Sequence, residues 1–336
     1  MKLKRILFVG FVSLLILLIA GITLTVGWRP FIGPRIRPLT SRRFQPTTER
    51  LERGKYIFSA VCGCASCHSQ HDYSQPGWPI VPGTEGAGND LGTEGLPGHV
   101  VAPNISSDPE TGAGNWTDDQ LARAIREGIA HDGRALFPLM PYDEFKQMSD
   151  EDLASVIVYM RSLPPARRTW PKTEIIFPVK YLIRAVPQPI TAPIPSPDPV
   201  NRVKYGAYLV NIGGCRFCHT PQLRGQAIAG MEFSGGNVFM EQGTSVASAN
   251  ITPDPSGISY YDEGLFLQAI RTGSVRARKL SPIMPFAVYR YQTDDDLKAI
   301  FAYLRTLKPA KHRVDNGEPP TYCRLCRTRH GAGNLN

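Results

Sequence analysis

Two pentapeptides, Cys64-Ala-Ser-Cys-His68 and Cys215-Arg-Phe-Cys-His219, decide how this chain of 336 residues is interpreted. Cys-x-x-Cys-His is the attachment signature of c-type haem, in which two thiols add to the vinyl groups of the macrocycle and the histidine binds the iron. Chance gives roughly 0.003 copies of this pattern in a chain with seven cysteines and seven histidines. The sequence therefore predicts two covalently bound haem c groups, held by Cys64, Cys67 and His68, and by Cys215, Cys218 and His219.

Two other chemistries use the same cysteine spacing, and both are disfavoured here. A redox-active dithiol is expected within a βαβ unit, and no such pattern surrounds either pentapeptide. A zinc site needs four ligands from paired clusters, and neither pentapeptide has a second cluster beside it.

A haem iron that serves only as an electron carrier, and is held by histidine on one face, takes a second protein ligand on the other face. Met140 and Met284 both stand in Met-Pro-aromatic sequences, 72 and 65 residues after His68 and His219. Methionine usually fills a core, an interpretation that suits Met148, Met160, Met231 and Met240. Because Met140 and Met284 recur at matching positions, we expect them to be the axial ligands. Ligation by a methionine sulfur raises the reduction potential of the haem iron. An iron with both axial positions filled by protein is typical of an electron carrier rather than an enzyme.

The sequence also repeats itself outside these motifs. Gly54-Lys-Tyr-Ile matches Gly206-Ala-Tyr-Leu, and Asn104-Ile-Ser-Ser-Asp-Pro matches Asn250-Ile-Thr-Pro-Asp-Pro. A repeat of this length is a duplicated domain rather than a solenoid unit. The expected organisation is an anchor at 1–28, a basic linker at 29–48, a first domain at 49–165, a Pro-rich linker at 166–199, a second domain at 200–310 and a tail at 311–336.

Helical patterns dominate both copies. Ser149 and Thr293 precede acidic first turns and apolar residues at helical spacing, and prolines follow both runs. Thr117-Asp-Asp-Gln120 is a capping box that opens a helix ending near Gly128. Because alternating strand patterns are scarce, the sequence predicts an all-α fold of two tandem domains.

The first residues predict a membrane helix. Residues 6–28 carry no charge and exceed the ~20 residues needed to cross a bilayer. An uncleaved anchor is favoured over a removed signal peptide, because the apolar run is long and lacks an Ala-x-Ala-like exit. Basic residues flank the run on both sides, and counting them alone would place the body in the cytoplasm. Haem c attachment occurs outside the cytoplasm, so we expect a single-pass protein of the bacterial inner membrane with its haem domains in the periplasm.

The charge distribution argues against nucleic-acid binding. The net charge is +9, but residues 1–53 carry +8 and residues 311–336 carry +3, so the body has no basic groove. The copies differ, with a net charge of −9 over residues 54–165 and +4 over residues 200–310. Because charge steers protein association, this difference favours different partners for the two domains, with drift on solvated loops as the alternative interpretation.

Several further stretches carry a family resemblance. They are Asn104-Ile, Asp108-Pro-Glu-Thr-Gly, Trp116-Thr-Asp, Arg126-Glu-Gly, Asp132-Gly-Arg, Met140-Pro-Tyr-Asp-Glu-Phe and Ser149-Asp-Glu-Asp-Leu. With these, each copy resembles a class I cytochrome c domain. The tandem resembles the cytochrome c subunits of membrane-bound alcohol and gluconate dehydrogenases and related bacterial dihaem cytochromes. Those subunits typically carry three haems where this chain has two motifs, and its second copy lacks the Asp-Gly-Arg stretch.

The remaining cysteines and histidines leave alternatives open. Cys323-Arg-Leu-Cys326 is followed by Arg327, with His330 further on, so a local disulfide, a metal site that includes His330 and an unusual third haem all compete. Cys62 is interpreted as an unpaired thiol. The other histidines, His71, His99, His131 and His312, are expected to be surface or loop residues rather than ligands.

Together these patterns predict a membrane-anchored, periplasmic dihaem cytochrome c. It would transfer electrons between a dehydrogenase or quinol donor and a downstream respiratory acceptor, with redox proteins as partners. A peroxidase-like dihaem enzyme and a haem-based sensing or structural module are the alternatives.

Overall fold

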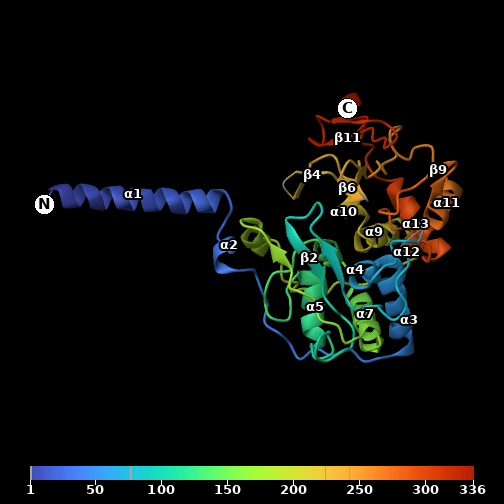
Figure 1. Cartoon of the computed structure of the whole chain (residues 1–336), viewed down its shortest axis with the longest axis horizontal. Coiled ribbons are helices and arrows are strands. Elements are labelled where there is room, and N and C mark those ends of the chain that lie inside the picture. The colour runs from blue at the N-terminus through green and yellow to red at the C-terminus, as the bar shows by residue number, and fades with distance from the viewer. Residues whose placement is uncertain (1, 76–77, 224, 242) are drawn as a thin grey trace.

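A computed structural model describes residues 2–75, 78–223, 225–241 and 243–336. Helix α1 (Lys2–Leu24) stands apart from the folded body, and none of its residues is buried (Figure 1). It is long and apolar enough to cross a membrane, a property that signal sequences share. The short helix α2 (Arg29–Ile32) leads into the body.

The body contains one set of five helices twice. The first set is α3 (Thr48–Tyr56), α4 (Cys64–His68), α5 (Asp118–Glu127), α6 (Tyr142–Phe145) and α7 (Asp150–Ser162), with the π-helix η1 (Ile57–Val61) extending α3. The second set is α9 (Arg202–Ile212), α10 (Cys215–His219), α11 (Glu263–Thr272), α12 (Phe286–Tyr289) and α13 (Asp294–Leu304). Each helix of the second set lies where the sequence repeat places it.

The predicted helix ends are confirmed. Thr117 accepts a hydrogen bond from the Gln120 N–H while the Gln120 side chain bonds back to Thr117, and α5 ends at Gly128 with a φ of +71°. Ser149 and Thr293 cap α7 and α13 through their hydroxyl groups. These caps satisfy N–H groups that have no partner inside the helix.

Short strands add to the helices, so the structure differs from the all-α prediction. They pair as antiparallel hairpins: β1 (Asn89–Gly92) with β2 (Gly98–Ala102), β4 (Gln222–Leu223) with β5 (Gln226–Ala227), β6 (Val238–Glu241) with β7 (Thr244–Ala247), β8 (Ser274–Val275) with β9 (Arg278–Lys279), and β10 (Pro320–Tyr322) with β11 (Arg329–Gly331). Strands of two to five residues are too short to show an alternating apolar pattern, which is why the sequence did not indicate them.

The two segments expected to be linkers lie against the first half. Arg37 forms ion pairs with the buried carboxylates of Asp119 (2.7 Å) and Glu127 (2.8 Å). In the Pro-rich segment, β3 (Glu174–Ile175) pairs with β2, and the short helices α8 (Val179–Leu182) and η2 (Ile183–Ala185) follow. A last short helix, η3 (Gly333–Leu335), closes the tail.

Two glycines allow the main helix pairs to approach closely. Helix α3 packs on α7, and α9 packs on α13. A Cβ at Gly54 would overlap the Ser155 carbonyl oxygen, and one at Gly206 would overlap the Ala299 carbonyl oxygen. Both pairs contribute to a single buried apolar cluster that runs through the two halves.

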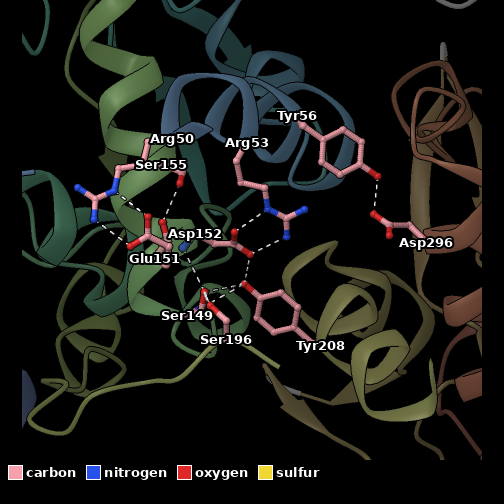
Figure 2. Close-up of polar contacts among 10 residues, drawn as sticks. All are labelled: Arg50, Arg53, Tyr56, Ser149, Glu151, Asp152, Ser155, Ser196, Tyr208 and Asp296. Carbon is pink, nitrogen blue, oxygen red and sulfur yellow. Dashed lines mark hydrogen bonds and ion pairs between the residues drawn. The ribbon is translucent and has the colours of Figure 1, made fainter. Parts of the chain in front are cut away.

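The halves are joined by a reciprocal pair of hydrogen bonds. The Tyr56 hydroxyl of α3 donates to the Asp296 carboxylate of α13, and the Tyr208 hydroxyl of α9 donates to the Asp152 carboxylate of α7. The oxygen–oxygen distance is 2.5 Å in both hydrogen bonds (Figure 2). Each hydroxyl also accepts a backbone N–H from the cap of the facing helix, Thr293 or Ser149, at 3.1 and 3.2 Å. Tyr56 and Tyr208 are equivalent in the repeat, as are Asp152 and Asp296, so the interface has approximate two-fold symmetry.

Replacing Tyr56 by Phe should lower the free energy of unfolding by about 1–3 kcal/mol, because a buried acceptor loses its donor. Among the described residues, the Asp296 carboxylate bonds to no other side chain, whereas Asp152 also pairs with Arg53. Tyr208→Phe should therefore cost less. Tyr291→Phe is the control, because Tyr291 is 71% exposed. Equal denaturation midpoints for Tyr56→Phe and Tyr291→Phe would contradict this role.

Candidate haem-binding sites

Each Cys-x-x-Cys-His motif forms a short helix that begins after a left-handed glycine. Gly63 precedes α4 with a φ of +61°, and Gly214 precedes α10 with a φ of +69°. Glycine adopts this backbone conformation without the steric penalty of a side chain. Helical geometry then places the two cysteines of each motif, three positions apart, on one face.

The two motif histidines are held in one tautomer. The Nδ1 atom of His68 lies 2.8 Å from the Pro103 carbonyl oxygen, and that of His219 lies 2.7 Å from the Ala249 carbonyl oxygen. Because a carbonyl oxygen can only accept, Nδ1 carries the proton and the lone pair remains on Nε2. Burial lowers the pKa of both rings, which favours the neutral form that binds metals.

The thiols of the motifs are partly enclosed. Burial, followed by the neighbouring Cys67 thiol, raises the pKa of Cys64 to about 12, and burial followed by Cys218 does the same for Cys215. In the described part of the chain these cysteines form no disulfide. Two free thiols beside a histidine with an available Nε2 lone pair are the donor set that covalent haem c requires, so the residues fit this cofactor.

Met140 and Met284 occupy equivalent turns. Each lies just before a short helix, α6 or α12, and each is partly buried against the apolar cluster. The turns are held alike: the rings of Tyr142 and Phe286 pack against Gly128 and Gly273, where a Cβ would lie 2.6 Å from ring atoms. The two methionines therefore lie in equivalent turns of the backbone. Iron ligation by them stays a prediction.

The two motifs lie next to each other at the junction of the halves. Burial, followed by the nearby Cys67 of the other motif, raises the pKa of Cys218 to about 11. Tyr289 is partly buried, and its phenol is close enough to cysteines of both motifs for their charges to raise its pKa further, after burial itself. Its hydroxyl donates to the Gly213 carbonyl oxygen, 2.6 Å away.

Sequence reasoning missed the residues that line this junction. Glu144 is buried, 3.7 Å from Arg216 inside the second motif, and burial raises the pKa of its carboxyl while Arg216 opposes that shift. Glu144 follows Met140 by four residues, and Tyr289 follows Met284 by five. Their places close to predicted ligands were the sequence signal for them.

The other cysteines and histidines divide into two groups. His71 bonds to two backbone carbonyls, His99 pairs with Asp90, and His131 lies against Trp116. Among the residues that the structure describes, none of these three belongs to a group that could hold a metal ion. Cys62 is half-buried and unpaired. His312, expected at the surface or in a loop, lies in the loop after α13 but is completely buried, next to Cys323, Cys326 and His330.

Comparisons with known proteins identify the family to which the chain is similar. The family model described as "Cytochrome c" matches residues 51–164. The cytochrome c subunit of the quinone alcohol dehydrogenase of Gluconobacter oxydans is 26% identical over 84% of this chain and 60% of its own length. The fructose dehydrogenase cytochrome subunit of Gluconobacter japonicus is 31% identical over 81% and 57%, respectively.

The chain spans less than two thirds of the length of those two relatives. It covers 70% of a diheme cytochrome c-type protein of Cereibacter sphaeroides, with 32% identity over 65% of this chain. The family match, this relative and the paired cysteine–histidine sites point to the same conclusion. This chain belongs to the cytochrome c family.

Proposed function

We propose that this protein transfers electrons through two covalently bound haem c groups, as the cytochrome subunit of a dehydrogenase complex. The observation that carries the proposal is the pair of equivalent sites, in which His68 and His219 present Nε2 from the same fixed tautomer beside two free thiols. The proposed domains are residues 49–165 and 200–310, each with one site.

The chain's own residues would hold both cofactors beside a shared junction. Haem supplies an iron that gains and loses one electron. His68 and Met140 would hold one iron, and His219 and Met284 would hold the other, so that protein side chains would occupy the positions that a substrate would need. Gly213, just before the second motif, lies beside Val61, just before the first, so an electron entering one half would have a short route to the other.

The proposed partners and location rest on three supports. Relatives are named as cytochrome c subunits of alcohol, fructose and gluconate dehydrogenases, so a dehydrogenase is the proposed donor. Helix α1 is proposed to anchor the chain in the bacterial inner membrane. Haem c attachment outside the cytoplasm supports a periplasmic body, from which a respiratory acceptor would be reached.

Intact mass measurement of the denatured protein should show two haems. Replacing both Cys64 and Cys67 by Ala should remove one haem, and replacing both Cys215 and Cys218 should remove the other, because the thioether bonds then cannot form. Cys62→Ser, which lies outside both motifs, should retain two. One or three haems on the unaltered chain would contradict the proposed count.

Replacing Met140 or Met284 by Ala should abolish one His/Met charge-transfer band and lower the potential of one haem. The shift should be a sizeable part of the ~0.8 V range over which axial ligands set haem potentials. Met240→Ala is the control, because Met240 is exposed and outside the equivalent turns. Unchanged spectra in both variants would exclude methionine ligation, and a readily opened iron site with peroxide turnover would favour the enzyme alternative.

A further inference from the structure

The tail at 311–336 contains a compact group of four buried ligand-type side chains, here called the tail cluster: His312, Cys323, Cys326 and His330. One ligand atom from each lies within 4.8 Å of the others. The two cysteines occupy the turn of the β10–β11 hairpin, His330 lies in β11, and His312 reaches them from the segment that follows α13.

The separations match a four-coordinate site. The His312 Nε2 atom lies 3.3 Å from the Cys323 sulfur and 3.2 Å from the His330 Nε2 atom. Zinc–nitrogen bonds of about 2.0–2.1 Å and zinc–sulfur bonds of about 2.3 Å, at tetrahedral angles, separate two nitrogens by about 3.4 Å and a nitrogen from a sulfur by about 3.5 Å. These two separations are therefore near the spacing that a tetrahedral ion imposes, and the other ligand atoms lie within 4.8 Å of one another.

Both histidines are oriented by partners outside the tail cluster. The Nδ1 atom of His312 lies 3.0 Å from the Ser234 carbonyl oxygen, and that of His330 lies 3.0 Å from the Gly331 carbonyl oxygen. These acceptors place the proton on Nδ1 and leave the Nε2 lone pairs facing each other inside the cluster. Two facing lone pairs repel, and a cation between them turns this arrangement into a stable one.

Thr328 and Gly236 pack against the Cys326 sulfur and the His312 ring. The Thr328 hydroxyl lies 3.0 Å from the Cys326 sulfur and 3.3 Å from the Gly236 carbonyl oxygen. A Cβ at Gly236 would lie 2.6 Å from the His312 ring and 3.5 Å from the Cys326 sulfur. Glycine at this point lets the backbone cover one side of the cluster.

The tail has no apolar core of its own. Within residues 311–336, all of which the structure describes, the buried side chains are the four ligands and Ala332. The apolar cluster of the body ends with Leu304 and the partly buried Leu307. A small segment without a core is held together in many proteins by a structural metal, whose binding energy becomes folding energy.

We propose that His312, Cys323, Cys326 and His330 bind a structural zinc ion. Two sulfur and two nitrogen ligands in tetrahedral arrangement suit zinc, and four protein ligands leave no position for a substrate. Binding converts both thiols to thiolates and releases their protons to solvent. Because Arg327 stands where a haem motif has histidine, the site is distinct from the two haem sites.

Elemental analysis of the purified full-length holoprotein, grown with zinc, tests this proposal. We expect one zinc per chain, counted against protein rather than against haem, so that the result is independent of the proposed electron transfer. Cys323→Ser/Cys326→Ser and His312→Ala should each weaken zinc binding by at least about 10-fold. Cys62→Ser and His131→Ala are matched controls outside the tail cluster and should retain the metal.

A second measurement uses the unaltered chain, in case a variant fails to fold. Removing the metal with a chelator should make the tail, which contains Arg313, Arg324, Arg327 and Arg329, the first part cleaved by trypsin, and added zinc should restore its resistance. The proposal is overturned if zinc is absent and alkylation shows a Cys323–Cys326 disulfide. It is equally overturned if a third haem is attached to these cysteines, or if chelation leaves cleavage of the tail unchanged.

Discussion

The reciprocal Tyr–Asp exchange between the halves is the constraint on which the rest of the arrangement depends. A helix pair that presents one tyrosine and one carboxylate can satisfy both groups against a second copy of itself only if the two copies are related by a two-fold axis. Tyr56 and Asp152, with their equivalents Tyr208 and Asp296, meet this condition. The haem motifs begin eight and seven residues after the two tyrosines, so the same symmetry brings them together at the junction.

The two copies nevertheless differ in the segments that pack over the loop behind each motif. Asn104 donates to the Ala166 carbonyl oxygen after the first copy, and Asn250 donates to the Ala310 carbonyl oxygen after the second, so both trailing segments start along equivalent paths. In the first copy Trp170 then packs over the loop behind the motif, with its Nε1 atom 2.7 Å from the Ala87 carbonyl oxygen. In the second copy the tail cluster lies against the corresponding loop. The two copies thus cover equivalent loops differently, one with an indole ring and the other with the tail cluster.

Local signals predicted the parts of the fold that depend on neighbours in the chain. The caps at Thr117, Ser149 and Thr293 and the repeat itself were readable because each depends on residues a few positions apart or on direct comparison. The position of His312 could not be predicted in this way, because His312 contacts Cys323 and His330 only after the chain turns back through a hairpin. The strand that residues 174–175 add to β2 is another long-range pairing that no local pattern indicates. Ligation by Met140 and Met284 rests on the repeat and stays a prediction.

The junction between the two motifs is asymmetric in polarity but nearly balanced in charge. On one side Glu144 faces Arg216, while the equivalent of Glu144 in the second copy is Val288, which lies beside Gly63, just before the first motif. An isolated buried carboxylate would stabilise the oxidised form of a nearby redox centre, and an isolated guanidinium would do the reverse. Because the two charges lie 3.7 Å apart, they largely cancel at longer range. On the proposed electron route between the halves, this pair by itself would therefore favour neither direction by charge.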